Sequence, residues 1–247
     1  MRVPLEPGPL GRLTARVSDF VCEAGGWQHL FDTCPIGQRK PLSGHATVQA
    51  PDKHIGLKGS LWLAGSAAVT DQLNQLVCAA AGSALDAMAT VAQCTHTSVV
   101  NVVIIGCRSA HPVRDTPAHV DHADTPYSEL LVPVSTPADS APPGLKLLDE
   151  GGSFTTVHHE VGSAMWLRDA PHIVEERQYS DDDILVIVAA TVAECQGLGP
   201  PAQFMHVKQF NPALLGVFTL WGKQQQDGGQ EQEQGGGLRR SKRRKQW

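Results

Sequence analysis

Short apolar runs separated by turn-forming residues dominate the chain beyond Thr97. The runs are rich in Val, Ile, Leu and aromatic residues, and clusters of Gly, Pro, Asp and Ser lie between them. Runs of this length and composition are typical of β-strands in a sandwich or barrel. The predicted strands cover residues 98–107, 127–134, 144–148, 153–161, 163–167, 183–192, 202–210 and 214–221.

The segment Ser66–Gln93 differs from these runs because Ala and Leu dominate it. Its composition favours an α-helix, Thr70 or Asp71 is suited to cap the N-terminus, and Gly82 is expected to interrupt the helix. A helical segment followed by eight strands predicts the α+β class. We expect a double-stranded β-helix core, of the jelly-roll or cupin-like kind, with N-terminal supporting helices.

Composition divides the chain into three parts. Residues 1–97 are expected to form an N-terminal extension with helical support, and residues 98–222 the jelly-roll core. Residues 223–247 form a tail rich in Gln, Gly and basic residues, with too few apolar groups to offset the entropy of ordering, so we expect disorder there. The segments 51–58 and 133–144 are rich in turn formers and predict surface loops.

Targeting signals and charge bear on the compartment. The chain has no apolar run of signal-peptide or membrane-span length, and its six cysteines show no CxxC spacing, so we expect reduced thiols and no membrane partner. Residues 223–247 carry seven Lys/Arg against three Asp/Glu, which leaves a formal charge of -9 on the rest of the chain. The basic cluster 239–245 predicts nuclear localisation or DNA tethering, with the cytoplasm as the other compartment.

The strongest chemical signal is a set of metal-ligand residues. His119 and Asp121 stand two residues apart, so on an extended segment their side chains point to the same side. His172 follows about fifty residues later, after Gly162 and the predicted strand 163–167, where the next strand begins. Two imidazoles and one carboxylate form the facial triad of mononuclear iron(II) sites, which leaves positions open for a cosubstrate and dioxygen.

Other histidines are weaker candidates for the same role. The chain contains eleven, among which His122, His158 and His159 lie nearest to the three predicted ligands in sequence or in predicted strand order. The helical HExxH motif of zinc hydrolases does not occur in the sequence. We therefore predict that His119, Asp121 and His172 bind the metal.

These residues resemble the motif of the iron(II)/2-oxoglutarate dioxygenase superfamily, over roughly residues 98–190. The HxD pair, the turn and strand from Gly162 to Leu167, and the distal His172 each match. The resemblance implies a non-haem iron(II)-dependent dioxygenase, with a basic residue about ten positions after the distal histidine that pairs with the cosubstrate carboxylate.

The expected basic residue is missing from this chain. The segment 181–183 supplies three aspartates there, which would repel a dianionic cosubstrate. Arg177 and Arg114 are the candidate substitutes for cofactor binding, and Arg108 is a third. Alternatively, the cosubstrate is not 2-oxoglutarate.

Asp124 adds a carboxylate three residues after Asp121. An ionised carboxylate accepts hydrogen bonds, so Asp124 is a candidate catalytic residue that receives the N4 amino group of cytosine or the hydroxyls of a cosubstrate such as ascorbate. The alternative is a structural role, in which Asp124 is a loop aspartate that caps a turn before Pro126.

Compact size and the short spacing between the HxD pair and His172 resemble the TET/JBP branch, which oxidises the 5-methyl group of pyrimidines in nucleic acid. One algal group of that branch is associated with ascorbate. The resemblance implies 5-methylcytosine in DNA as substrate, extruded from the duplex, with 2-oxoglutarate or ascorbate as cosubstrate. Candidate stacking residues for the base are Trp166, Tyr127, Tyr179 and Phe154.

Two other functions fit parts of the pattern. A prolyl-type protein hydroxylase would share the iron site but should carry a Lys near its end. A cupin-like binding protein without turnover should show a broken triad, whereas the triad here is whole. The sequence contains no signal for a particular oligomeric state.

Overall fold

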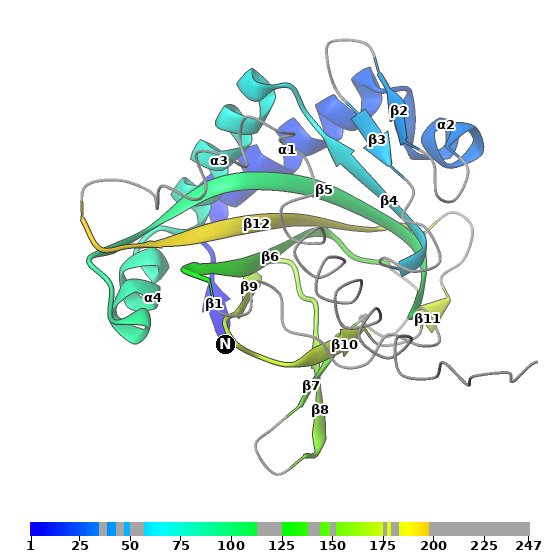
Figure 1. Ribbon diagram of the computed structural model, residues 1–247. Helices are drawn as coiled ribbons and strands as arrows, with labels where there is room; N and C mark the ends of the chain where they lie inside the picture. Colours follow the sequence, from blue (N-terminus) through cyan, green and yellow to red (C-terminus); the bar gives the residue numbers. More distant parts are fainter. Residues whose placement is uncertain are drawn as a thin grey trace, which may run out of the picture.

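Two antiparallel sheets and a set of helices make up the fold, described here from a computed structural model (Figure 1). The structure describes residues 1–34, 39–42, 47–49, 57–112, 125–137, 144–148, 152–174, 177–178 and 183–197. The helices are α1 (Pro7–Glu23), α2 (Gly26–Thr33), α3 (Ala67–Ala81) and α4 (Ala84–Ala92).

The strands of the large sheet lie in the order β1-β9-β6-β12-β5-β4-β3-β2, and β11 pairs with β5. They are β1 (Arg2–Pro4), β2 (Arg39–Pro41), β3 (Thr47–Gln49), β4 (Leu57–Ala64), β5 (His96–Pro112), β6 (Tyr127–Ser135), β9 (Ser163–Leu167), β11 (Arg177–Gln178) and β12 (Leu185–Cys195). The small sheet has the order β10-β7-β8. Its strands are β7 (Gly144–Leu148), β8 (Phe154–His158) and β10 (His172–Val174).

The connections between the sheets give a jelly roll. The chain leaves the large sheet after β6, forms β7 and β8 in the small sheet, returns for β9, crosses again for β10 and returns for β11 and β12. The last described strand, β12, lies between β5 and β6, so the central order β5-β12-β6-β9 mixes strands that are distant in sequence. This Greek-key order with two opposed sheets is that of a jelly roll, and the predicted α+β class is confirmed.

Helices cover one face of the large sheet. In α1 the apolar residues Leu10, Leu13, Val17 and Phe20 recur at helical spacing and are all buried in the main hydrophobic core. Figure 1 shows α1 and α3 on one side of the large sheet and the small sheet on the other. The central strand β12 is accordingly buried at nearly every position, so its side chains are covered on both faces.

The predicted broken helix is confirmed, with one change at its start. α3 ends at Ala81, its C-cap Gly82 has a φ of 50°, and α4 begins at Ala84. Ser66 caps α3, because its Oγ accepts a hydrogen bond from the Val69 backbone N–H at 3.4 Å. The predicted caps were wrong: Thr70 and Asp71 lie inside the helix.

Two features of the N-terminal region were not predicted. α1 and α2 precede the predicted helix, and β4 begins at Leu57, inside the segment expected to be a loop. Within the described residues, no single helix is long and apolar enough to cross a membrane, although the sharply bent pair α3 and α4 passes that test jointly by length and composition.

The alternation along β12 separates the two faces of the large sheet. Val186, Val188 and Ala190 join the core under the helices, whereas Leu185 and Ile187 pack with Cys107 on the opposite face. That opposite face looks into the space between the two sheets, which we call the jelly-roll interior. Leu145 of β7 meets Met165 and Leu167 of β9 in this interior.

Candidate metal centre

The predicted ligand set lies partly outside the described residues. His119, Asp121, Asp124 and Arg114 all fall in the segment 113–124, which the structure does not describe. Arg177 begins β11 and its backbone pairs with Ala110 of β5, but its side chain also lies outside the description. These assignments remain predictions, and His172 is the predicted ligand that can be placed.

His172 is the first residue of β10 and is 4% exposed. It is directly paired with Leu147 of β7, and directly paired residues in antiparallel strands share a face. Leu147 packs with the cluster of Leu145, Met165 and Leu167 that fills the jelly-roll interior. The imidazole of His172 therefore faces the interior.

A backbone contact fixes the tautomer of His172. Its Nδ1 lies 3.0 Å from the carbonyl oxygen of Ala170. A carbonyl oxygen only accepts hydrogen bonds, so Nδ1 carries a proton, and in the neutral imidazole the lone pair is then on Nε2. Metal-binding histidines are commonly oriented in this way, with one ring nitrogen donating to a carbonyl and the other facing the metal.

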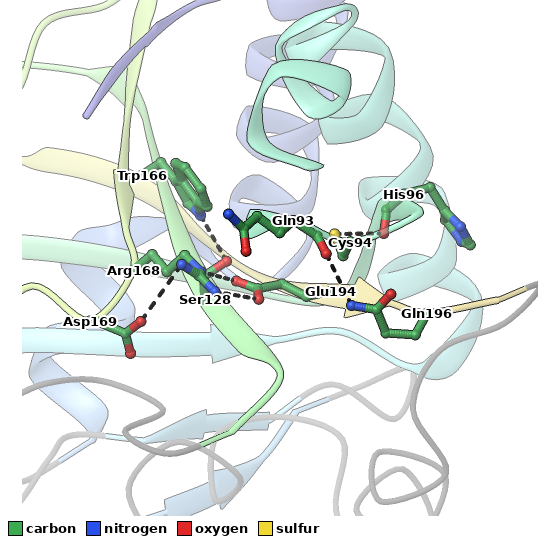
Figure 2. A network of polar contacts seen from close by, with 9 residues as sticks. All are labelled: Gln93, Cys94, His96, Ser128, Trp166, Arg168, Asp169, Glu194 and Gln196. Atoms are coloured by element: carbon green, nitrogen blue, oxygen red, sulfur yellow. Dashed lines mark hydrogen bonds and ion pairs between the residues drawn. The ribbon is translucent and has the colours of Figure 1, made fainter. Parts of the chain in front are cut away.

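The four residues before His172, Arg168–Pro171, form a turn that we call the His172 turn. It begins with an ion pair in which Arg168 donates to both carboxylate oxygens of Glu194, at 2.6 and 3.1 Å (Figure 2). These hydrogen bonds raise the pKa of the Arg168 guanidinium. The turn continues through Asp169, whose φ is 49°, and ends where the Pro171 carbonyl accepts from the Leu148 N–H at 2.8 Å.

These contacts join the His172 turn to both sheets. Glu194 lies in β12 of the large sheet and Leu148 in β7 of the small sheet. Figure 2 shows a further link nearby, in which the indole N–H of Trp166 donates to the Ser128 hydroxyl at 2.7 Å. His172 is thus carried on a turn with few degrees of freedom, as a metal ligand requires.

Trp166 and Arg108 do not face the jelly-roll interior. Trp166 belongs to the core under the helices, so it does not serve as a stacking residue for a base in the interior. Arg108 stacks on the Phe31 ring of α2, with its guanidinium carbon 4.3 Å from the ring centroid, and it donates to Gln28. This orientation excludes Arg108 as a cosubstrate anchor inside the barrel.

The alternative histidines lie at the end of β8. His158 closes that strand, and His159 follows it with 4% exposure. No hydrogen bond reaches Nδ1 of His159. Burial, followed by the positive charges of His158 and Arg2, lowers the pKa of His159 to about 4. Within the described part of the chain, no group of three or more His, Cys, Asp or Glu side chains is placed to hold a metal.

A cavity of about 370 Å³ lies between β8 and β9, next to the cross-strand pair of His172 and Leu147. Leu147, which is paired with His172, forms one wall, and Met165 and Leu167 form another. Its remaining lining comes from Met1, Arg2, Thr156, Val157 and His158. The volume falls in the range of small-molecule sites, and apolar side chains predominate in the walls.

Sequence reasoning missed one charged residue of the interior. Glu129 of β6 is 6% exposed and is directly paired with Leu167 on one side and Thr191 on the other. Because Leu167 faces the interior, Glu129 does so too. The sequence did contain a sign of this residue. Glu129 is the one acidic residue in the run 127–134, and it stands two positions before Leu131, so both lie on the same face of the strand.

Comparisons with known proteins give structural similarity without a sequence match. No protein-family model and no curated protein sequence matches the chain. Among solved structures, the chain is similar to the non-haem α-ketoglutarate-dependent epimerase SnoN from nogalamycin biosynthesis, at 12% identity and a TM-score of 0.45, with 76% of this chain and 84% of that chain covered. It is also similar to a Pseudomonas putida prolyl-4-hydroxylase, at 11% identity and a TM-score of 0.40, with 80% and 92% covered.

Proposed function

We propose that this protein is a non-haem iron(II)-dependent dioxygenase whose metal is held by His172 together with His119 and Asp121. The observation that carries the proposal is the setting of His172, which is buried, faces the jelly-roll interior and has its Nδ1 within hydrogen-bond distance of the Ala170 carbonyl oxygen. His119 and Asp121 supply the other imidazole and the carboxylate of a facial triad.

The residues of the chain fit this metal in chemistry and in setting. Bound iron(II) would supply the activation of dioxygen for oxidation of a C–H bond. The Ala170 carbonyl holds the proton on Nδ1 of His172, and the His172 turn limits the movement of the ring. Leu145, Met165 and Leu167 pack together and give the interior near the ring apolar walls.

For the cosubstrate we propose 2-oxoglutarate or ascorbate, with Arg114 and Arg177 as the candidates for pairing with its carboxylate. The inward-facing positions of β12 are Leu185, Ile187, Ala189 and Thr191, all uncharged. A cation that anchors the cosubstrate therefore has to come from another segment. This requirement supports the choice of the two arginines.

As substrate we propose the 5-methyl group of 5-methylcytosine in DNA, with Asp124 as the acceptor for the N4 amino group. A base must leave the stack to reach a site between two sheets, because an intact duplex does not fit there. The basic cluster 239–245 supports a nucleic-acid partner and a nuclear location, since Lys and Arg on a flexible arm bind phosphates.

The second candidate function is a prolyl-type protein hydroxylase with the same iron site. A peptide substrate would need a groove rather than a base pocket, and it would make the basic tail dispensable for catalysis. A non-catalytic cupin-like binding protein is the third, and it would bind neither iron nor dioxygen.

The direct test is to replace His172 and measure iron. Wild type, His172→Ala and the surface control His29→Ala are loaded with iron(II) without oxygen, and bound iron is counted after desalting. We expect one iron per chain in the wild type and the control and almost none in His172→Ala. Retention of a full equivalent of iron by His172→Ala would overturn the metal assignment.

The substrate is tested on the same preparations. Methylated DNA is incubated in air with each cosubstrate in turn, and the nucleosides are measured by mass spectrometry. We expect loss of 5-methylcytosine with the wild type and not with His172→Ala. An iron-loaded wild type that leaves 5-methylcytosine unchanged with both cosubstrates would exclude the DNA substrate while leaving the metal assignment intact.

A further inference from the structure

The cavity of about 370 Å³ between β8 and β9 has apolar walls from both sheets. Its aliphatic lining belongs to one packed cluster and consists of Leu147, Val157, Met165 and Leu167. Leu147 and Val157 are only partly buried, so part of their apolar surface remains uncovered beside the cavity. Removing apolar surface from water is favourable, and the walls therefore favour a ligand with an apolar part.

Arg2 places a positive charge at the edge of this cavity. It lies in β1 and is directly paired with Met165 of β9, so the two side chains share a face of the large sheet. Its guanidinium reaches across to the small sheet, where it donates to the His158 carbonyl at 2.9 Å and to Glu160 at 2.9 and 3.2 Å. Arg2 therefore spans the cavity between the edge strands β1 and β8.

The ionisable side chains that line the cavity are basic. They are Arg2 and His158, and none of the described lining residues is acidic. Glu129 is paired with Leu167 but does not line the cavity, and it already interacts within the protein. The positive charge extends to His159, because burial, followed by the charges of His158 and Arg2, lowers the pKa of that residue to about 4. The charges along the cavity thus favour an anionic ligand.

The ion pair of Arg2 with Glu160 does not prevent Arg2 from binding a ligand. Both side chains are substantially exposed, and exposed pairs contribute little to stability. The Nε–H of Arg2 makes no hydrogen bond to the described residues, which leaves a donor for a ligand. A carboxylate that approaches from the cavity can therefore join or replace Glu160 at the guanidinium.

We propose that this cavity binds an alkyl carboxylate, with the alkyl chain against the four aliphatic walls and the carboxylate on Arg2. The ligand class is a small amphipathic monoanion of the short fatty-acid type. 2-Oxoglutarate fits this cavity poorly, because its second carboxylate would be buried against apolar side chains. The inference uses only described residues and does not rest on the proposed iron site.

The experiment measures dissociation constants by calorimetry for octanoate, for the uncharged octanamide and for 2-oxoglutarate. The full-length wild type is compared with Arg2→Met, which removes the charge, Glu160→Gln, which removes the competing carboxylate, and Val157→Phe, which fills the cavity. Arg12→Met is the matched control, because Arg12 is an exposed arginine of α1. Thermal unfolding shows that each variant is folded before ligand is added.

We expect octanoate to bind the wild type and Arg12→Met equally and to bind Arg2→Met about tenfold more weakly. Glu160→Gln should bind octanoate about threefold more tightly, because Arg2 is then free of its competitor. Octanamide should bind these four proteins alike, whereas Val157→Phe should weaken both octanoate and octanamide. Opposite shifts for Arg2→Met and Glu160→Gln, confined to the charged ligand, cannot arise from reduced folding.

Several results would overturn the inference. A wild type that binds no octanoate would refute the site, and equal octanoate affinity in the wild type and Arg2→Met would refute the role of Arg2. Octanoate binding that survives in Val157→Phe would place the ligand outside this cavity. 2-Oxoglutarate that binds the wild type more tightly than octanoate, and loses that affinity in Arg2→Met, would refute the ligand class. None of these measurements depends on bound iron, so the metal assignment stands or falls separately.

Discussion

The two faces of the large sheet are built from the same strands but differ in what packs against them. The face under the helices is packed with aliphatic side chains such as Leu13, Ile104 and Val188. The face toward the small sheet is also mostly apolar, but it includes Glu129 and borders a cavity next to His172. The first face is filled by the main hydrophobic core, whereas the second is packed less completely and carries a buried acidic side chain. Changes on either face should therefore affect different measurements.

The largest expected effect is on the helix-covered face. Leu13→Ala removes a fully buried side chain of α1, and we expect a loss of about 3 kcal/mol in the free energy of unfolding, because a cavity remains. Urea denaturation measures this loss. Iron affinity of the folded fraction should not change, and a fall in iron affinity without lost stability would contradict the division between the two faces.

Acid should lower the free energy of unfolding through His159, the buried residue that follows β8. Its pKa is lowered from 6.5 to about 4 in the folded protein, so the unfolded chain takes up a proton first as the pH falls. Stability is then full above pH 6.5 and declines between pH 6.5 and 4, by up to about 3 kcal/mol.

Thermal unfolding at a series of pH values tests this decline. His159→Gln, which does not titrate, should show a flatter profile than the wild type in that range. The exposed control His29→Ala should keep the wild-type slope. Equal slopes in the wild type and His159→Gln would show that other groups cause the acid sensitivity.

A smaller effect is expected where the two faces meet, at the His172 turn. Arg168→Met removes the two hydrogen bonds to Glu194 and should lower iron affinity about tenfold, since a ligand is held less firmly. Arg168→Lys keeps the charge without the two-point geometry and should fall between Arg168→Met and the wild type. Chelator competition gives the affinities. Identical iron affinity in all three proteins would show that the ion pair does not position His172.

The smallest effect is expected at the surface pair of Arg2 and Glu160. Both side chains are substantially exposed, at 42% and 53%, so Glu160→Gln should cost no more than about 0.5 kcal/mol of unfolding free energy. Raising the salt concentration should remove the difference between variant and wild type. A loss comparable to that of Leu13→Ala would mean that the β1 edge contributes as much as the helix-covered core.

Much of the fold could be predicted from local sequence. The β-rich runs that became β5, β6, β7, β8, β9 and β12 were visible because apolar residues and turn formers alternate clearly there. α1 was harder to predict because Pro7, Gly8, Pro9 and Gly11 weaken its helical composition, although its apolar stripe is regular. α2 depends on a tertiary contact, since a side chain on Gly106 would meet the Trp27 ring at 2.5 Å.

Candidate site residues could be predicted only where their spacing in the sequence, along one strand or between neighbouring strands, forms a recognisable pattern. His172 was predicted as a ligand from its distance to the HxD pair and its place after the strand that became β9; the structure places it buried at the start of β10, and its role stays a prediction. Glu129 was missed because alternation groups residues by face without showing which face is the interior. The pair of Arg168 and Glu194 joins positions far apart in sequence through β6, and only the strand order β9-β6-β12 reveals it.

The central place of β12 has a consequence for how the protein is made. β12 fills the gap between β5 and β6, with β5 beginning about ninety residues before β12 does. Until the ribosome has released residues 185–195, β5 and β6 each present an unpaired apolar edge, and such edges recruit other chains. Formation of the sheet must await nearly the whole described chain, so we expect slow folding and dependence on chaperones during synthesis. A premature stop after β9 would leave an aggregation-prone fragment rather than a smaller version of the folded protein.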